Sequence, residues 1–139
     1  MALKRVVVTG LGALTPIGNN LEDFWSGLIA GKSGSAPVTY FDTEKFKTKF
    51  ACELKGFDPL EFLDRKQQRK MDRFTQYGMV STDEAIIDSG IDLEKIDKLR
   101  VGVIWGSGIG GLETFQNEVL NYAQGDGCLL YTSDAADDW

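Results

Sequence analysis

The sequence of 139 residues contains no histidine. Without imidazole, these residues cannot assemble a Ser-His or Cys-His nucleophile pair, a histidine metal ligand or an imidazole general base. The two cysteines, Cys52 and Cys128, lie far apart and match neither a zinc motif nor a disulfide framework. Any catalysis by this chain alone would have to use carboxylates, lysine, tyrosine or a lone thiol.

Long hydrophobic runs are missing as well. No apolar stretch approaches the roughly 20 residues that a membrane helix needs, and no secretory signal precedes Val6. The net charge is −6, from 15 basic and 21 acidic side chains, and this acidic balance disfavours nucleic acid as a partner. We therefore expect a cytoplasmic globular domain with no membrane partner.

Two apolar, β-branched runs predict buried strands of the parallel type. The first is Lys4–Gly10 (KRVVVTG), which closes on a glycine, and the second is Arg100–Trp105 (RVGVIW). A weaker, exposed edge strand is expected within 47–54 (KTKFACEL). Cys52 lies in this weaker strand, and we expect its thiol to be buried and inert, because neither a base nor a helix N-terminus adjoins it.

Helical periodicity separates these strands. The best example repeats apolar side chains at i, i+3, i+4, i+7 and i+8, with Asn20 as its N-cap and Gly31 just past its end. Helices are expected at 21–29, at 59–63, from 71 to 89, and after the glycines 106–111 to about residue 124. Strands that alternate with helices predict an α/β domain whose sheet is mostly parallel and flanked by helices.

The C-terminal stretch 128–139 (CLLYTSDAADDW) does not continue the last helical pattern. Back-translated as TGT CTC TTA TAC ACA TCT GAC GCT GCC GAC, residues 128–137 resemble the transposase-based adapter used to prepare sequencing libraries. We interpret residues 1–127 as an incomplete natural domain and 128–139 as a non-native tail. The alternative is a natural acidic tail.

The glycines Gly106, Gly108 and Gly111 match the dinucleotide fingerprint G-x-G-x-x-G between a predicted strand and a helix. A nucleotide site also needs an acid about 20 residues later, at the end of a second strand, and none is present. The earlier loop places Thr15 where a third glycine should follow Gly10 and Gly12. For both loops, a nucleotide cradle and simple tight packing remain open.

A basic run, Arg65–Arg73, interrupts an otherwise acidic chain at the expected start of the long helix. Lys66, Arg69 and Lys70 are spaced at i, i+3 and i+4, so a helix would present them together. Such a patch suits an acidic partner that is attracted by long-range electrostatics. The alternative is an ordinary solvated helix face.

Together, three stretches resemble the β-ketoacyl-[acyl-carrier-protein] synthases of fatty-acid synthesis, type II in particular. They are VVVTGLGALTPIGN (6–19), RKQQRKMDRFTQYG (65–78) and GVIWGSGIGGLET (102–114), in the order and spacing of that family. The resemblance covers residues 3–127. It implies the N-terminal part of a thiolase-like, layered αβαβα fold, truncated here, from an enzyme that is a homodimer.

Members of this family condense malonyl-acyl-carrier protein with an acyl thioester held on a cysteine, assisted by two histidines and a lysine. The resemblance places all of these residues downstream of this chain, and the context of Cys52 (FACEL) is not the nucleophile motif. We therefore expect this chain to be inactive by itself. Neither a cofactor nor a metal is expected.

Two site assignments follow from the resemblance. Lys66, Arg69 and Lys70 match positions that contact the acidic acyl carrier protein. Ile109, between Gly108 and Gly110, matches a residue that closes the acyl-chain pocket near the dimer interface. The alternatives are a small nucleotide-binding α/β domain and a carrier-protein-binding module that acts through the basic helix alone.

Overall fold

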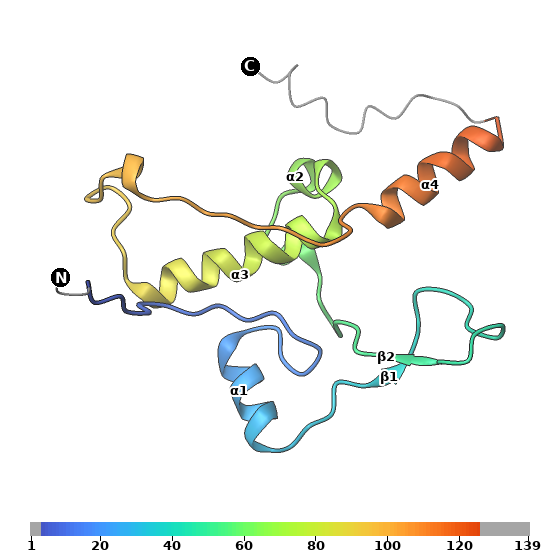
Figure 1. The fold of residues 1–139 in the computed structure, drawn as a ribbon, viewed down its shortest axis with the longest axis horizontal. Coiled ribbons are helices and arrows are strands. Elements are labelled where there is room, and N and C mark those ends of the chain that lie inside the picture. The colour runs from blue at the N-terminus through green and yellow to red at the C-terminus, as the bar shows by residue number, and fades with distance from the viewer. Residues whose placement is uncertain (1–3, 126–139) are drawn as a thin grey trace. The chain divides into compact units, whose positions relative to one another are not determined.

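The computed structural model describes residues 4–125 (Figure 1). They fall into two compact units, one comprising 4–58 and 79–102 and the other comprising 59–78 and 103–125. The stretch 128–139, interpreted above as a non-native tail, and the domain boundary at 127 lie outside the described residues. Each unit is treated by itself below.

The first unit holds α1 (Leu21–Ile29), the two-stranded pair β1 (Ala36–Pro37) and β2 (Phe50–Ala51), and a 3₁₀ turn at Lys98–Arg100. The second unit holds a 3₁₀ turn at Pro59–Glu61, the short helix α2 (Arg65–Lys70) and α4 (Leu112–Ala123). The long helix α3 (Arg73–Ser89) contributes its residues up to Gly78 to the second unit and the remainder to the first.

Helix α1 has the ends that the sequence predicts. The Asn20 side-chain oxygen accepts a hydrogen bond from the Asp23 backbone N–H at 2.7 Å, which satisfies one of the free donors of the first turn. Just past the end of the helix, Gly31 takes a left-handed φ of 65°, which glycine adopts without steric cost. The prediction of a helix over 21–29 is confirmed.

The first glycine loop lies against α3, and its glycines serve close packing. A Cβ atom on Gly12 would collide with the carbonyl oxygen of Ser81, and one on Gly10 would collide with that of Ala85. Acidic side chains of α3 bind the N–H groups of this segment: Glu84 accepts hydrogen bonds from Ala13 and from Leu21, each at 2.7 Å. The packing interpretation therefore holds for this loop.

Glu84→Gln is expected to destabilise the first unit by about 1–3 kcal/mol, because an amide offers one acceptor oxygen and leaves either the Ala13 or the Leu21 N–H without its partner. The carboxylate also lies at the N-terminus of α1, where negative charge is favourable. Hydrogen exchange of both amides would measure the effect. Glu44→Gln, in an exposed loop, is the control; equal protection in the two variants would contradict the prediction.

The predicted strands at 4–10 and 100–105 are not formed in the described residues. Within residues 4–125, neither segment has a ladder partner, and the sheet found there is the antiparallel pair of β1 and β2. A strand needs neighbours that accept and donate along its backbone. Val6 is 92 % exposed and Ile104 is 100 % exposed, so no neighbouring layer covers them. The α/β class stands, and a mostly parallel sheet is not confirmed.

The weak edge strand expected within 47–54 is present as β2, which pairs Ala51 with Ala36 and Phe50 with Pro37. Beside it, Thr39 donates its hydroxyl to the Glu53 carboxylate at 2.7 Å, and this hydrogen bond lowers the pKa of Glu53. Cys52 is exposed, so the expectation of a buried thiol is wrong. Cys52 directly follows β2, and its exposure continues the alternation of exposed Phe50 and half-buried Ala51.

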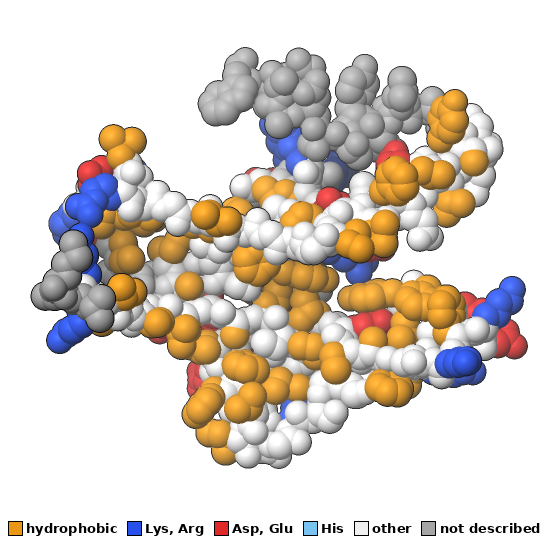
Figure 2. Space-filling model, in the orientation of Figure 1, with side chains coloured by type: hydrophobic (Ala, Val, Ile, Leu, Met, Phe, Trp, Pro, Cys, Tyr) orange, Lys and Arg blue, Asp and Glu red, His pale blue; other side chains and the backbone are white. Residues whose placement is uncertain are grey.

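Few side chains in the described residues are buried. Between residues 4 and 125, the buried hydrophobic side chains are Val80 in the first unit and Leu63 in the second, and hydrophobic side chains spread over much of the visible surface (Figure 2). No helix between residues 4 and 125 is both long and apolar enough to cross a membrane.

Candidate functional site

The basic run forms a helix of its own, α2, and not the first turn of the long helix. Asp64 caps it through a reciprocal pair: its carboxylate accepts from the Gln67 backbone N–H at 2.8 Å, and the Gln67 side chain accepts from the Asp64 backbone N–H at 3.3 Å. The helix ends at Met71, whose backbone is extended. The cations Arg69 and Lys70 therefore lie in a last turn, where positive charge is favourable.

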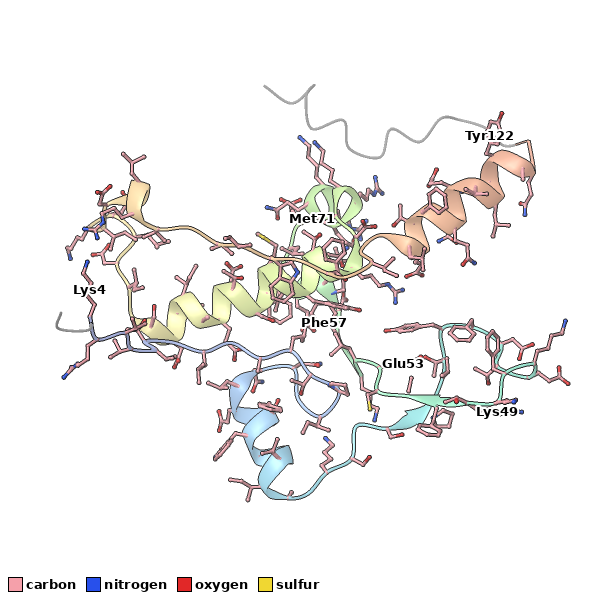
Figure 3. All side chains as sticks on the ribbon, in the orientation of Figure 1. Lys4, Lys49, Glu53, Phe57, Met71 and Tyr122 are labelled. Atoms are coloured by element: carbon pink, nitrogen blue, oxygen red, sulfur yellow. The ribbon has the colours of Figure 1, made fainter. Side chains whose placement is uncertain are left out.

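Lys66, Arg69 and Lys70 are all exposed on α2. Nitrogen-tipped side chains project outward from this helix (Figure 3). The helical spacing brings the three cations to one face, as the sequence predicts. The face is a compact positive patch on a protein of net charge −6.

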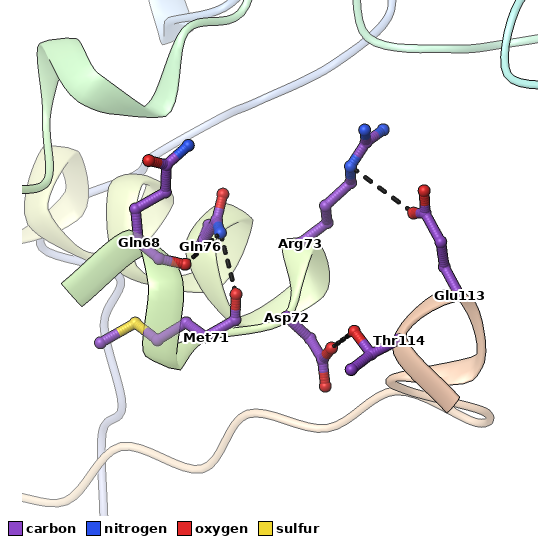
Figure 4. A network of polar contacts seen from close by, with 7 residues as sticks. All are labelled: Gln68, Met71, Asp72, Arg73, Gln76, Glu113 and Thr114. Atoms are coloured by element: carbon purple, nitrogen blue, oxygen red, sulfur yellow. Dashed lines mark hydrogen bonds and ion pairs between the residues drawn. The ribbon is translucent and has the colours of Figure 1, made fainter. Parts of the chain in front are cut away.

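The junction between α2 and α3 is held by one buried amide. Gln76, which is 7 % exposed, donates its side-chain Nε2–H groups to the carbonyl oxygens of Gln68 at 3.1 Å and Met71 at 2.9 Å (Figure 4). Both acceptors belong to the end of α2, where carbonyl groups lack partners within the helix. A side chain of α3 thus fixes the end of the helix that carries the cations.

The second glycine loop leaves Trp105 and returns to the start of α4 through Gly111. The indole Nε1–H of Trp105 donates to the Phe74 carbonyl oxygen at 3.0 Å, and its ring lies against Gly78 of α3. A Cβ on Gly78 would come within 2.6 Å of the ring. Glycine inside a helix costs about 1 kcal/mol relative to alanine, and the approach of this ring accounts for it here.

Helix α4 begins beside an acid. Gly111 precedes it with a left-handed φ of 70°, and the hydroxyl of Thr114 donates to the carboxylate of Asp72 (Figure 4). The adjoining pair Arg73–Glu113, at 3.6 Å, is exposed and contributes at most about 1 kcal/mol. Because a carboxylate already occupies this helix N-terminus, it would repel a phosphate. The geometry disfavours the nucleotide-cradle interpretation of the second loop.

Ile109 and Gly110 line a cavity of about 450 Å³ beside the first turns of α3. The apolar lining consists of Met71, Phe74, Tyr77, Ile109 and Leu112 together with the loop glycines, and the polar lining includes Asp72, Gln76 and Asn117. Gly108 lies in the exposed part of the loop and does not line this cavity. The cations of α2 do not line it either, so the two sets of predicted residues form separate sites.

Four residues that shape these sites were not predicted as site residues from the sequence. They are Asp72, Gln76, Trp105 and Thr114. One signal was available, because a glycine in the middle of a helix, such as Gly78, often marks a close approach of another group. The partners of Asp72 and Gln76 could not be identified without the fold.

Residues 3–135 match the family model described as "Beta-ketoacyl synthase, N-terminal domain". The chain belongs to the β-ketoacyl synthase family and corresponds to that N-terminal domain.

Three curated relatives share the name 3-oxoacyl-[acyl-carrier-protein] synthase 2. The chain is 47 % identical over 116 residues to 3-oxoacyl-[acyl-carrier-protein] synthase 2 of Vibrio cholerae, 44 % over 115 residues to that of Synechocystis, and 46 % over 113 residues to that of Staphylococcus aureus. The alignments cover 84 %, 83 % and 81 % of this chain. The chain spans about 28 % of the length of these relatives.

Solved structures of ketosynthases are similar in fold. The ishigamide ketosynthase/chain length factor matches with a TM-score of 0.62 and 37 % identity, over 68 % of this chain and 24 % of that one. A ketosynthase of a type II polyketide system, determined in complex with its acyl-carrier protein, matches with a TM-score of 0.66 and 29 % identity, over 87 % of this chain and 31 % of that one.

Proposed function

We propose that this chain is the N-terminal part of a cytoplasmic 3-oxoacyl-[acyl-carrier-protein] synthase of type II, an acyltransferase of fatty-acid synthesis. The observation that carries the proposal is the 47 % identity to the Vibrio cholerae synthase over 84 % of this chain. The cationic face of α2 and the cavity at Ile109 add geometry that suits such an enzyme.

The reaction of the full-length enzyme is a decarboxylative Claisen condensation. An acyl group is held as a thioester on an enzyme cysteine, and malonyl-acyl-carrier protein loses CO₂ to give an enolate. The enolate carbon attacks the acyl carbonyl carbon, the carbon–sulfur bond to the cysteine breaks, and 3-oxoacyl-acyl-carrier protein leaves. The 139 residues hold no histidine, so this chain contributes substrate-binding surfaces and we expect it to be inactive alone.

Lys66, Arg69 and Lys70 are proposed to bind the acyl carrier protein. The net charge of this chain is −6 and would repel an acidic partner overall, so a local cationic face would decide where such a partner docks on it. The capping box of Asp64 and the amide of Gln76 hold this face in place at both ends of α2.

Ile109 is proposed to close the acyl-chain pocket, with Gly108 and Gly110 giving it room to move. We also propose that the extended segments 4–10 and 100–105 are strands of a mostly parallel sheet in a layered αβαβα fold, completed in a full-length homodimer. Their β-branched side chains are exposed in the described residues, and further layers would cover them.

The test uses the full-length enzyme with acyl- and malonyl-acyl-carrier protein as substrates, and mass spectrometry of the carrier protein. The expected product is 3-oxoacyl-acyl-carrier protein. Residues 1–127 alone are the control and should give none. Absence of product from the full-length enzyme at every acyl chain length would refute the proposal. Micromolar binding of NAD or ATP by this chain in equilibrium dialysis would instead favour the nucleotide-binding alternative.

Residues 128–139 are proposed to be non-native because one back-translation of residues 128–137 resembles a sequencing adapter, although the family match extends to residue 135. An independent read of the gene past codon 127 tests this. A continued frame that encodes a cysteine and two histidines would support both the tail assignment and the family's catalytic set. The same twelve residues in the independent read would contradict the tail assignment.

A further inference from the structure

The middle of the second glycine loop is exposed. Ile109 is 76 % exposed, and a Cβ built on Gly106 or Gly108 would meet nothing within 4 Å. The two ends of the loop are different, because each contacts the first two turns of α3 through side chains or close packing.

Trp105 fixes the upstream end. Its indole N–H binds the Phe74 carbonyl oxygen at 3.0 Å, and its ring occupies the space that a side chain on Gly78 would fill. The hydrogen bond sets the direction of the ring and the glycine sets how closely it approaches. Residue 105 is therefore held against α3 by two independent features.

Asp72 and Thr114 fix the downstream end. The Thr114 hydroxyl donates to the Asp72 carboxylate, which is a charge-assisted hydrogen bond between residues 42 positions apart in sequence. Next to it, Gly110 lies close to the Phe74 ring, where a Cβ would come within 2.6 Å of the ring. The first turn of α4 and the last residues of the loop are thus held on α3.

We propose that Trp105 and the Asp72–Thr114 pair are two anchors that suspend the glycine loop from α3 and set how far Ile109 can move. They are positioning residues for acyl-chain selection, and this inference rests on the proposed function. Ile109 lies within a short span between fixed ends, so its excursions are limited. Release of either end lengthens the free span and lets the side chain move further from the cavity.

Loss of one anchor should favour longer acyl chains over shorter ones. In the full-length enzyme, Thr114→Val keeps the shape of the side chain and removes the hydroxyl, and Trp105→Phe keeps a ring and removes the indole N–H. Each is expected to raise the ratio of kcat/KM for long chains to that for short chains between about two- and tenfold, which corresponds to the loss of one hydrogen bond. The KM for malonyl-acyl-carrier protein should stay unchanged.

Two controls separate positioning from general damage. Thr114→Ser restores the hydroxyl and should restore the wild-type ratio. Thr48→Val makes the same change in an exposed loop and should leave the ratio unchanged. Equal loss of activity at all chain lengths in Thr114→Val and Trp105→Phe, or no change in the ratio, would overturn the inference. Lack of product from the wild-type enzyme would instead refute the proposed function, so the two failures are distinguishable.

Discussion

Charge reversal at Lys66 and Arg69 in the full-length enzyme is expected to raise the KM for acyl-carrier-protein substrates by about 10- to 100-fold, because like charges placed opposite each other at an interface cost several kcal/mol. The value of kcat should change little, since α2 is separate from the cavity at Ile109. Steady-state kinetics with malonyl-acyl-carrier protein at low and moderate salt would measure the effect, which should shrink as salt screens the charges.

The matched control is the same double reversal at Lys47 and Lys49. Both lysines are exposed in the loop that leads to β2, and the pair changes the net charge by the same amount. If carrier-protein docking depends on the face of α2, this control should keep a near wild-type KM. Equal effects of the two double variants would mean that net charge alone acts, and the docking assignment would be wrong.

Ile109→Phe should lower kcat/KM for long acyl chains by about 10- to 100-fold while short chains remain good substrates, because the larger side chain takes up space in the cavity that a long acyl chain would need. Gly110 already lies close to the Phe74 ring, so the loop has little space to retreat on that side. The measurement is kcat/KM across a series of acyl-carrier-protein chain lengths.

Ile109→Leu is the control for this substitution, since it nearly conserves volume and should keep the chain-length profile. A uniform loss of activity at every chain length in Ile109→Phe would show that the residue supports the structure in general. It would then have no particular part in closing the pocket.

The helices α1, α3 and α4 were predictable because their signals are local, whereas the helix expected at 59–63 is only a 3₁₀ turn at Pro59–Glu61. Asn20 at the start of α1 and Gly31 just past its end act through neighbouring residues, and each takes the expected conformation. The break between α2 and α3 was missed. No glycine or proline marks it, and it is held by the amide of Gln76, which binds carbonyl groups eight and five residues away.

The strands predicted at 4–10 and 100–105 are not formed in the described residues, and the reason is different. β-Branched runs report that a segment suits a sheet, but pairing depends on which other segments lie alongside. In the described residues, the segments around Val6 and Ile104 have no such neighbours. The weak strand β2 is formed because the chain reverses direction between residues 37 and 50 and returns alongside β1.

The sequence predicted the two candidate sites to different extents. The face of α2 could be read from charge and helical spacing, whereas Ile109 followed only from the resemblance to known synthases. The anchors around it could not be read at all. The Asp72–Thr114 hydrogen bond joins residues 42 positions apart, and no local rule predicts such a pair.

The hydrogen bonds that hold the two ends of α2 leave most of its cationic side chains available for substitution. Gln76 binds backbone carbonyl groups, and the capping box uses Asp64 and Gln67, so the supports of the helix do not involve the side chains of Arg65, Lys66 and Arg69. These exposed positions can be exchanged without disturbing what holds the helix. The proposed carrier-protein contact can thus be redesigned at three positions of α2, with the capping box and the Gln76 hydrogen bonds left unchanged.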